Sequence, residues 1–323
     1  MKVVVLGGKG FLGASVVDVF RRAGHDVEPC SRRTGIDARR EPALTEYLGR
    51  IGPEILVNCA AHVGGIAYNE KCPVAIYEDN LLLGFTILRA SYRAGVKKLV
   101  NIMPNCTYPG EMQLYSEARW WDGPMHPTVL TYGMPRKAIW VQAWAYQKEY
   151  SFQSIHLVLP NLYGPRDHFD PVRSHALGAL IRKVVDAKRQ GLRRVEVWGT
   201  GKPVREWMYV EDAAAGIVRA AQRYDSIEIL NLGAGKGCSI RELAGMVREA
   251  AGWDGEFTFD LARPDGAPMK ILDVSRMRAA LSGWEPPTRL RDGIARTIES
   301  YLAYSNGVQI PQPVESSTHP ARD

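Results

Sequence analysis

The amino-acid sequence predicts an α/β fold in which a doubly wound parallel sheet is joined by a smaller C-terminal α/β lobe. Short apolar, β-branched segments alternate with segments whose apolar residues recur at helical spacing. A glycine-rich loop directly follows the first of these apolar segments. The 323-residue chain is 46% hydrophobic and 24% charged, which is typical of a globular protein with a large core. Strands and helices in alternation form parallel sheets with helices on both faces.

The predicted elements follow one another in a regular order up to Gly164. The expected strands are 3–6, a segment that begins near residue 25, 55–59, 98–103 and 155–159. The expected helices are a segment that begins near residue 11 and ends at Gly24, 81–92 and 138–150. After Gly164 the alternation weakens, and there remain a helix at 177–188, strands at 195–198 and 229–232, and a helix at 240–251.

The weaker alternation of strands and helices after Gly164 indicates where the chain divides into two units. Residues 1–165 are expected to form the first unit, to which a later segment at about 205–235 returns. Residues 166–204 and 236–303 are expected to form the smaller lobe. The tail at 306–323 is rich in Pro, Ser and Gln, and we expect it to be disordered.

Composition and charge exclude several classes of protein. The 41 basic and 35 acidic residues are interspersed, whereas a nucleic-acid groove concentrates positive charge. We therefore expect no nucleic-acid partner, and instead a pocket for a phosphorylated small molecule. The five cysteines match no zinc spacing, which favours reduced thiols in a cytoplasmic protein without a metal site. The four apolar residues after Met1-Lys2 are too few for a signal sequence or a membrane span, so no membrane partner is expected.

The glycine-rich loop has the spacing of a phosphate-binding turn. Gly7, Gly10 and Gly13 form G-x-x-G-x-x-G between the first strand and the first helix. Glycine permits the tight turn and a close approach of the backbone to a pyrophosphate, while the helix N-terminus supplies N–H donors. The alternative is a tight turn without a ligand. The motif favours a Rossmann-type dinucleotide site, whose other expected residues are Lys9, Phe11 and Leu12.

The end of the second strand indicates which dinucleotide is bound. An acidic residue there bonds the ribose 2′-hydroxyl of NAD, whereas Arg accommodates the 2′-phosphate of NADP. Here Arg32 and Arg33 follow Cys30-Ser31, and Lys9 adds positive charge. The alternative is that both arginines are merely solvated. We expect NADP(H) in preference to NAD(H). The expected cofactor-binding set also includes Asp37, Ala60 and Ala61.

Seven segments, in order along the chain, resemble the motifs of one protein family. They are GGKGFLG at 7–13, NCAAHVGG at 58–65 with Asn69, NCTYP at 105–109, PNLYGP at 160–165 with Asp167, Ser174-His175, VWGTGKPVREWMYV at 197–210 and KILDVS at 270–275. From residue 1 to about 303 the sequence resembles the extended short-chain dehydrogenases/reductases, also known as the NAD-dependent epimerase/dehydratase family. The resemblance is strongest to the NADPH-dependent 3,5-epimerase/4-reductases of 4-keto nucleotide sugars.

The resemblance implies a role for residues at matching positions. Tyr132 falls at the place of the catalytic Tyr, and Cys106 and His175 fall at those of the acid/base pair for epimerisation. Asn161 and Leu162 are expected beside the nicotinamide. The residues expected to hold a nucleotide-diphosphate sugar are Arg182, Trp198, Arg205 and Lys270, together with Asn161.

The helix at 138–150 carries a further expectation. Trp140 and Trp144 are four residues apart and so share one face of this helix. In the family, the corresponding helix often packs into a four-helix bundle between two subunits. The resemblance therefore implies a homodimer.

Two positions depart from the family's catalytic set. The family's Ser falls at Pro104 here, and its Lys, four residues after Tyr132, falls at Arg136. A Tyr with an ordinary pKa of about 10 needs a nearby cation to donate a proton at neutral pH. Arg136 can supply this charge, although it is bulkier than Lys, whereas Pro104 has no donor. Asn105 is a candidate replacement on the same loop, while Lys137 is rotated by about 100° from the face of Tyr132.

The chemistry of the retained pair leads to three hypotheses. A thiol and an imidazole suit proton exchange beside a ketone, because both can titrate near neutral pH. The first hypothesis is an epimerase that acts on a 4-keto sugar nucleotide through Cys106 and His175, with weak or altered reduction at Tyr132. The second is a full 3,5-epimerase/4-reductase that tolerates Arg136 and Asn105. The third is a catalytically silent relative that senses its cofactor and binds a partner protein. The loss of the family's Ser and Lys favours it, and the retained sugar-nucleotide residues oppose it.

Overall fold

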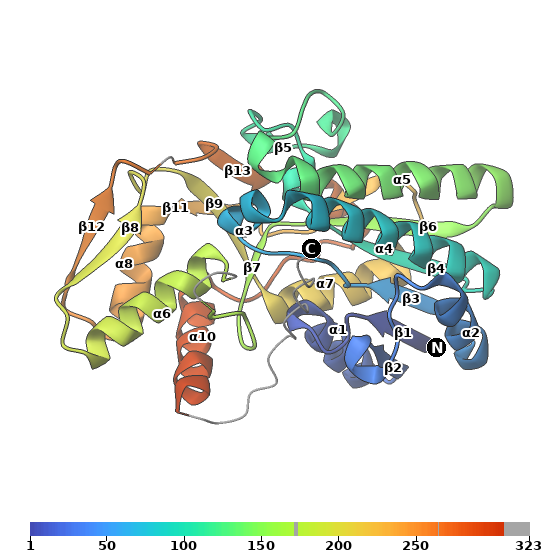
Figure 1. The fold of residues 1–323 in the computed structure, drawn as a ribbon, viewed down its shortest axis with the longest axis horizontal. Coiled ribbons are helices and arrows are strands. Elements are labelled where there is room, and N and C mark those ends of the chain that lie inside the picture. The colour runs from blue at the N-terminus through green and yellow to red at the C-terminus, as the bar shows by residue number, and fades with distance from the viewer. Residues whose placement is uncertain (171–173, 264, 307–323) are drawn as a thin grey trace, which may run out of the picture.

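Within residues 1–170, 174–263 and 265–306, which the computed structural model describes, a six-stranded parallel sheet forms the centre of the larger part of the molecule (Figure 1). Its strands are β1 (Lys2–Leu6), β2 (Asp26–Cys30), β3 (Ile55–Asn58), β4 (Lys98–Pro104), β6 (Gln153–Leu159) and β10 (Ile229–Asn231). The sheet order is β10-β6-β4-β3-β1-β2, and each neighbouring pair is parallel. The α/β class and the parallel sheet predicted from the sequence are confirmed.

Helices cover both faces of this sheet. They are α1 (Phe11–Arg22), α2 (Glu41–Ile51), α4 (Pro73–Arg93), α5 (Leu130–Tyr150), α7 (Val210–Arg223) and α9 (Ser275–Ala280). The short helix α3 (Ile66–Lys71) lies beside α4. Alternate residues of a strand point to opposite faces. In β1, Val3 and Val5 therefore join a core with α1 and α7, while Val4 and Leu6 join one with α2 and α4.

The smaller lobe is built around β9, which connects it to the larger part. The strands of the β9 sheet are β5 (Leu114–Tyr115), β7 (Asn161–Tyr163), β9 (Val204–Tyr209), β11 (Gly237–Ser239) and β13 (Met269–Leu272). Beside it, β8 (Arg194–Trp198) pairs with β12 (Glu256–Asp260). The helices α6 (Ala176–Arg189), α8 (Ile240–Ala251) and α10 (Leu290–Ser305) pack on one another around a separate apolar core.

Two helices begin earlier than the sequence predicts. α4 starts at Pro73 rather than at 81, and α5 starts at Leu130 rather than at 138. Pro135 lies inside α5 and is buried there, although a proline lacks the N–H that a helix interior uses. The helices α2, α3, α7, α9 and α10 were not predicted from the sequence.

The segment expected at about 205–235 is divided between the two parts. Its first strand, β9, belongs to the lobe, whereas α7 packs on the larger part and β10 pairs with β6 in the main sheet. We propose the remaining domain limits as they were predicted, except that β5 and β7 of the first unit pair in the β9 sheet and α9 packs on the larger part. The tail expected to be disordered lies outside the described residues from 307 onward.

A buried carboxylate joins the two parts of the molecule. Glu206 on β9 is fully buried, and its oxygens accept the N–H groups of Ala234 at 2.5 Å, Gly235 at 3.0 Å and Leu272 at 2.7 Å. Ala234 and Gly235 follow β10 of the larger part, while Leu272 ends β13 of the lobe. Burial raises the pKa of Glu206 to about 7, although three N–H donors favour the ionised form. This side chain therefore ties the main sheet to the lobe.

Replacing Glu206 with Gln should lower the free energy of unfolding by about 1–3 kcal/mol, the cost of leaving a buried polar group unsatisfied. In either orientation, the amide NH₂ group would face a backbone N–H instead of an acceptor oxygen. Denaturant unfolding at pH 8, where the wild-type carboxylate is ionised, measures the difference. Glu256→Gln, at an exposed position of β12, is the control and should change stability by less than about 0.5 kcal/mol. Equal stability of Glu206→Gln and wild type would contradict this prediction.

Candidate active site

The glycine-rich loop is shaped by close backbone contacts. Gly7 has a φ of +75°, in the left-handed region that favours glycine, and its N–H donates to the Cys30 carbonyl at 2.8 Å. A Cβ on Gly13 would lie 2.1 Å from the carbonyl oxygen of Gly7, so no larger residue fits there. Gly10 caps α1 without a side-chain bond, and the first turn of α1 contains no acidic residue. The backbone N–H groups of this turn are thus arranged for an anion such as a pyrophosphate.

The residues after β2 form the neighbouring part of this site. Arg32 and Arg33 lie exposed in a single helical turn, Arg32–Thr34, that directly follows β2. The buried hydroxyl of Ser31 has no hydrogen-bond partner in the described part of the chain. A polar atom of this kind, beside two arginines, fits the phosphate of a dinucleotide.

Asp37 lies near this turn, but its carboxylate is engaged by an arginine. Arg39 bonds it through Nε at 3.0 Å and Nη2 at 2.8 Å, and the same guanidinium reaches Asp79 at 2.8 Å. The hydrogen bonds of Arg39 hold the pKa of Asp37 below its usual range.

The loop after β3 closes the other side of the glycine turn. A Cβ on Gly7 would lie 3.0 Å from the nitrogen of Ala60, and the Ala60 N–H donates to the side chain of Asn58 at 3.1 Å. Ala61 follows at an exposed position, and Lys9 is exposed within the glycine loop. Phe11 and Leu12, the first residues of α1, are half-buried.

Arg136 is the cation beside Tyr132. Both lie in α5 one turn apart, and the guanidinium carbon of Arg136 is 5.5 Å from the centre of the Tyr132 ring. Burial raises the pKa of Tyr132, and Arg136 opposes this by favouring the phenolate. Arg136 is itself buried and donates through Nη2 to the Asn80 side chain at 2.9 Å. Its Nε has no partner among the described residues, so it remains available to a ligand.

Lys137 points to a different part of the structure. Its Nζ donates to the carbonyl of Trp120 at 2.6 Å and lies 4.5 Å from the ring centre of Trp121. Burial lowers the pKa of Lys137 to about 8. The amine is committed to this aromatic cluster and does not replace a lysine beside Tyr132.

The loop after β4 carries Asn105 and Cys106. Pro104 ends β4, and the next residues form a single buried turn, Asn105–Thr107. The Thr107 hydroxyl donates to the Pro104 carbonyl at 2.9 Å and accepts from the Trp120 indole at 2.9 Å. The buried Nδ2 of Asn105 has no partner in the described part of the chain. Asn105, rather than Thr107, is therefore the donor that this loop leaves for a ligand.

Cys106 lies among positively charged groups. Burial raises the pKa of its thiol to about 11, while Lys270 and Arg136 oppose this rise. Lys270 on β13 pairs in register with Arg205 on β9, and burial lowers the pKa of both side chains. Tyr132, Arg136 and Lys270 each interact electrostatically with Cys106, so the fold brings these residues together.

His175 immediately precedes α6 and faces a different carboxylate. Its Nδ1 lies 3.8 Å from Oδ1 of Asp167. Burial lowers the pKa of His175, but Asp167 raises it by more, so that it ends above its ordinary value. Ser174 lies against the loop after β3, where a Cβ on Gly65 would be 3.5 Å from its carbonyl oxygen. Among the described residues, no hydrogen bond or electrostatic interaction joins His175 to Cys106.

The remaining predicted residues lie on the lobe side. Asn161 and Leu162 belong to β7, and the Asn161 amide donates to the backbone of Glu206 at 3.0 Å. Trp198 ends β8 with 56% of its surface exposed, and the Arg263 guanidinium lies 4.8 Å from its ring centre. Arg182 lies in α6, and its buried Nε has no partner in the described ranges.

Sequence reasoning missed the residues that position this site. Asn80 on α4 accepts the N–H of His62 at 3.1 Å, donates to the His62 carbonyl at 2.8 Å and accepts from Arg136. The available signal was that Asn80 lies on the helix face of Ile76, Leu83 and Ile87, because a polar side chain on a buried apolar face requires partners. In the described ranges we find no helix long and apolar enough to cross a membrane, and no cluster of His, Cys, Asp and Glu suited to a metal ion.

Comparison with known proteins identifies the family. The model of the NAD dependent epimerase/dehydratase family matches residues 3–233. The chain belongs to this family. GDP-L-fucose synthase 1 of Arabidopsis thaliana is 34% identical over 302 residues, which cover 93% of each chain. The GDP-L-fucose synthase of Escherichia coli is 30% identical, over 93% of this chain and 96% of that protein.

Solved structures agree with this assignment. A GDP-6-OMe-4-keto-L-xylo-heptose reductase from Campylobacter jejuni has a TM-score of 0.87 at 26% identity and covers 94% of this chain and 98% of that one. A GDP-D-glycero-L-gluco-heptose synthase from the same organism, solved in the presence of NADPH, has a TM-score of 0.85 at 25% identity, with 93% and 98% covered. The family predicted from the sequence motifs is thus confirmed.

Proposed function

We propose that the protein is an NADP(H)-dependent enzyme that epimerises a 4-keto nucleotide-diphosphate sugar through Cys106 and His175. The observation that carries this proposal is the position of Cys106 among Tyr132, Arg136 and Lys270, at the carboxyl end of β4. The relatives named GDP-L-fucose synthase favour a GDP-sugar as the substrate.

Epimerisation beside a ketone needs no external reactant. One group removes the proton from the carbon next to the carbonyl, and the electron pair moves onto the carbonyl oxygen to form an enolate. A second group returns a proton to the opposite face of the same carbon. Arg136 and Lys270 would stabilise the negative charge of the enolate, because cations in a desolvated site act strongly on developing charge. We assign the two proton transfers to Cys106 and His175.

A full epimerase/reductase is the second candidate, and one observation favours it. The Nδ2 of Asn105 and the Nε of Arg136 are buried donors without partners among the described residues. Both lie close to Tyr132 in the fold, and they could hold the ketone oxygen and a cofactor ribose. NADPH, when bound, supplies the hydride for such a reduction. Tyr132 would then donate the proton to the oxygen.

We propose that the cofactor lies on the glycine loop and α1, with Ser31, Arg32 and Arg33 at its 2′-phosphate. The fit rests on the tight backbone turn that Gly7 and Gly13 permit, on the uncapped first turn of α1 and on the unpartnered Ser31 hydroxyl. Asp37 would not repel the phosphate, because Arg39 neutralises it.

The double variant Arg32→Ala/Arg33→Ala should lose most of a preference for NADPH over NADH. A charge-assisted hydrogen bond contributes about 1.5 kcal/mol or more, so each arginine should account for at least a roughly tenfold change in Kd. Calorimetric titration of both cofactors measures it. Arg22→Ala, an exposed arginine on α1, serves as the control. Equal affinities of the wild type for NADPH and NADH would refute the preference.

In deuterated buffer, the wild type should exchange the protons at carbon 3 or 5 of a GDP-4-keto-6-deoxy sugar. Cys106→Ser should slow this exchange by about 10²–10⁴-fold, because a hydroxyl is a far weaker acid than a thiol and gives up its proton much less readily. His175→Asn should stop it or trap a singly epimerised product. Proton NMR of the sugar gives the rates, and Cys72→Ser is the matched control. If both site variants exchange at the wild-type rate, the pair is structural.

With Pro104 and Arg136 in the catalytic positions, NADPH oxidation by the wild type should be slow with the same sugar. The double variant Pro104→Ser/Arg136→Lys should raise the rate, because it restores a hydroxyl donor and the smaller cation. Absorbance at the NADPH band follows the reaction. Wild-type turnover in the ordinary enzymatic range, about 1–10³ per second, would instead favour the full epimerase/reductase. Cofactor binding without exchange or reduction on any nucleotide sugar would favour a silent cofactor sensor.

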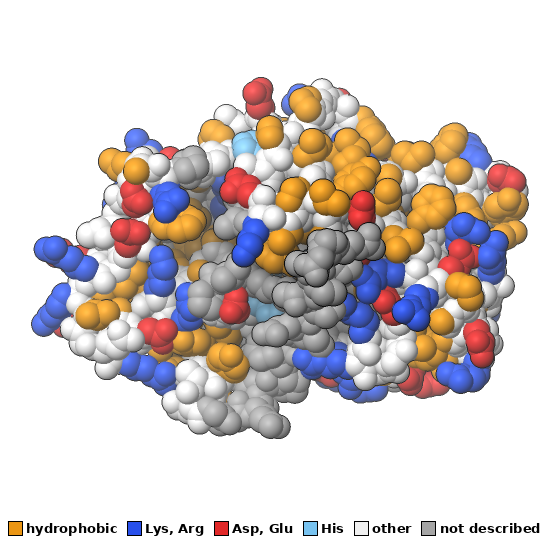
Figure 2. All heavy atoms as spheres, viewed as in Figure 1, with side chains coloured by type: hydrophobic (Ala, Val, Ile, Leu, Met, Phe, Trp, Pro, Cys, Tyr) orange, Lys and Arg blue, Asp and Glu red, His pale blue; other side chains and the backbone are white. Residues whose placement is uncertain are grey.

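We further propose that the enzyme is a homodimer joined through α4 and α5. Hydrophobic side chains gather over these two helices in Figure 2. On α4, Leu82 and Phe85 expose 49% and 47% of their surface, and on α5, Val141 and Trp144 expose 47% and 44%. A contiguous apolar face of this kind is typical of a subunit interface. Trp140 is instead turned inward, and its indole donates to the carbonyl of Ile227 at 3.0 Å.

A further inference from the structure

The loop that follows β7 holds a carboxylate to which the proposed chemistry assigns no role. Asp167 is fully buried, and its Oδ1 accepts the N–H of His168 at 2.7 Å. Its Oδ2 has no hydrogen-bond partner among the described residues. A buried carboxylate is costly unless a positive group or several donors compensate it. One backbone N–H is too little, so a further partner is required.

The first turn of α6 provides space for this carboxylate. A Cβ on Gly178 would lie 3.4 Å from Oδ2 of Asp167 and 3.1 Å from the carbonyl oxygen of His168. Asp167 therefore packs beside the N-terminal turn of a 14-residue helix, where the helix dipole favours negative charge. This explains in part how the buried charge is tolerated.

His175 supplies the remaining positive group. It occupies the N-cap position of α6, but its side chain makes no capping bond. Its Nδ1 lies 3.8 Å from Oδ1 of Asp167 and has no other partner in the described ranges. An imidazole held through Nδ1 presents Nε2 on the opposite side of the ring, and 38% of this side chain is exposed.

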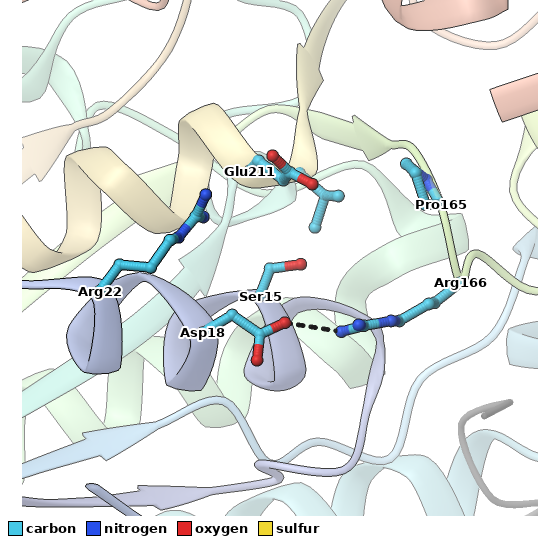
Figure 3. Close-up of a pocket in the computed structure, with 7 residues that line it drawn as sticks. Ser15, Asp18, Arg22, Pro165, Arg166 and Glu211 are labelled. Carbon is cyan, nitrogen blue, oxygen red and sulfur yellow. Dashed lines mark hydrogen bonds and ion pairs between the residues drawn. The ribbon is translucent and has the colours of Figure 1, made fainter. Parts of the chain in front are cut away.

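The loop is also fixed to the cofactor-binding part of the protein. Arg166, next to Asp167, has a φ of +68°, which is strained for a residue with a Cβ. Its guanidinium pairs with Asp18 of α1 at 3.0 Å (Figure 3). The close-up shows Arg166 reaching from the loop to the side of α1. Asp167 is thereby held relative to the helix whose N-terminus carries the glycine turn.

We propose that Asp167 is a positioning residue for His175: its carboxylate keeps the proton on Nδ1, directs Nε2 toward the sugar carbon and stabilises the imidazolium form. This rests on the proposed function for the role of His175, whereas the pairing itself is independent of any substrate. A carboxylate plays this part for the histidine of Ser-His-Asp hydrolases by the same physical means. The raised pKa of His175 agrees with the pairing.

The other groups near His175 do not offer the same interaction. The loop after β3 presents the backbone of Gly65 to Ser174. His62 on that loop is held by Asp79 at 2.8 Å and by the Tyr68 hydroxyl at 2.9 Å. Within the described residues, Asp167 is the charged group that interacts with the His175 ring.

The test is Asp167→Asn, with Asp170→Asn as the matched control, an exposed carboxylate on the same loop. NMR of histidine-labelled protein without substrate, with the His175 signal assigned by its loss in His175→Asn, gives the pKa of His175 directly. In Asp167→Asn this pKa should fall, because the group that favours the imidazolium is removed. In a plot of the deuterium-exchange rate against pH, the inflection caused by His175 should move to lower pH by the same amount as the His175 pKa. Exchange at the pH optimum should drop by at least about tenfold, short of the roughly 10⁴-fold loss seen in Ser-His-Asp enzymes.

The outcomes separate a positioning role from a structural one. An unchanged His175 pKa in Asp167→Asn overturns the proposal, even where melting temperature and activity both fall. If the variant does not fold, nitrogen NMR of the wild type tests the proposal instead. At a pH above the pKa of His175, the neutral imidazole should carry its proton on Nδ1. A neutral imidazole protonated on Nε2 overturns the proposal. A lowered His175 pKa, in a protein that exchanges no protons on any 4-keto sugar, supports the pairing and rejects the proposed function.

Discussion

The parallel register of the main sheet is the constraint on which the site depends. In this register Leu6 lies beside Asn58, Asn58 beside Asn101 and Pro104 beside Leu159. Parallel strands end at a common edge, and ligands of open α/β sheets bind beyond that edge. The glycine turn, the loop after β3, the turn that carries Cys106 and the β7 segment therefore meet at one place, although they are far apart in sequence.

The electrostatics of this edge are unusual for a protein interior. Arg136, Arg205 and Lys270 are shielded from solvent to different degrees, and none forms an ion pair within the described residues. Desolvated cations without counter-ions lower stability unless a ligand supplies the negative charge. A diphosphate and an enolate would supply it, which connects the positive charge of the pocket to the proposed substrate. Sites that stabilise charge in this way are often strained before the ligand arrives.

Much of the fold could be predicted from local pattern, whereas the site's supporting contacts could not. The strand segments are short and apolar, and the glycine turn has a fixed spacing, so both are visible in sequence. The direction of Lys137 follows from helix geometry alone, since one residue turns the side chain by about 100° from Tyr132. The start of α5 could not be predicted from the sequence, because Pro135 and Gly133 both disfavour helix and lie near its N-terminal end. Asn80 and Asp167 owe their roles to partners 56 and 8 residues away, respectively, and only the fold brings such pairs together.

The Glu206 carboxylate also sets how the two parts can move. It binds backbone groups from the loop after β10 and from β13, so β9, β10 and β13 are fixed at one point. A rotation that separated β9 from β10 and β13 would break three hydrogen bonds to one charged group. The lobe elements remote from this point, the β8–β12 pair and the helices α6 and α8, take no part in these three hydrogen bonds. Opening the molecule at this point would therefore cost more than displacing the elements at the far end of the lobe, and Asn231 on β10 adds two further bonds there, to the carbonyls of Tyr115 and Asp273.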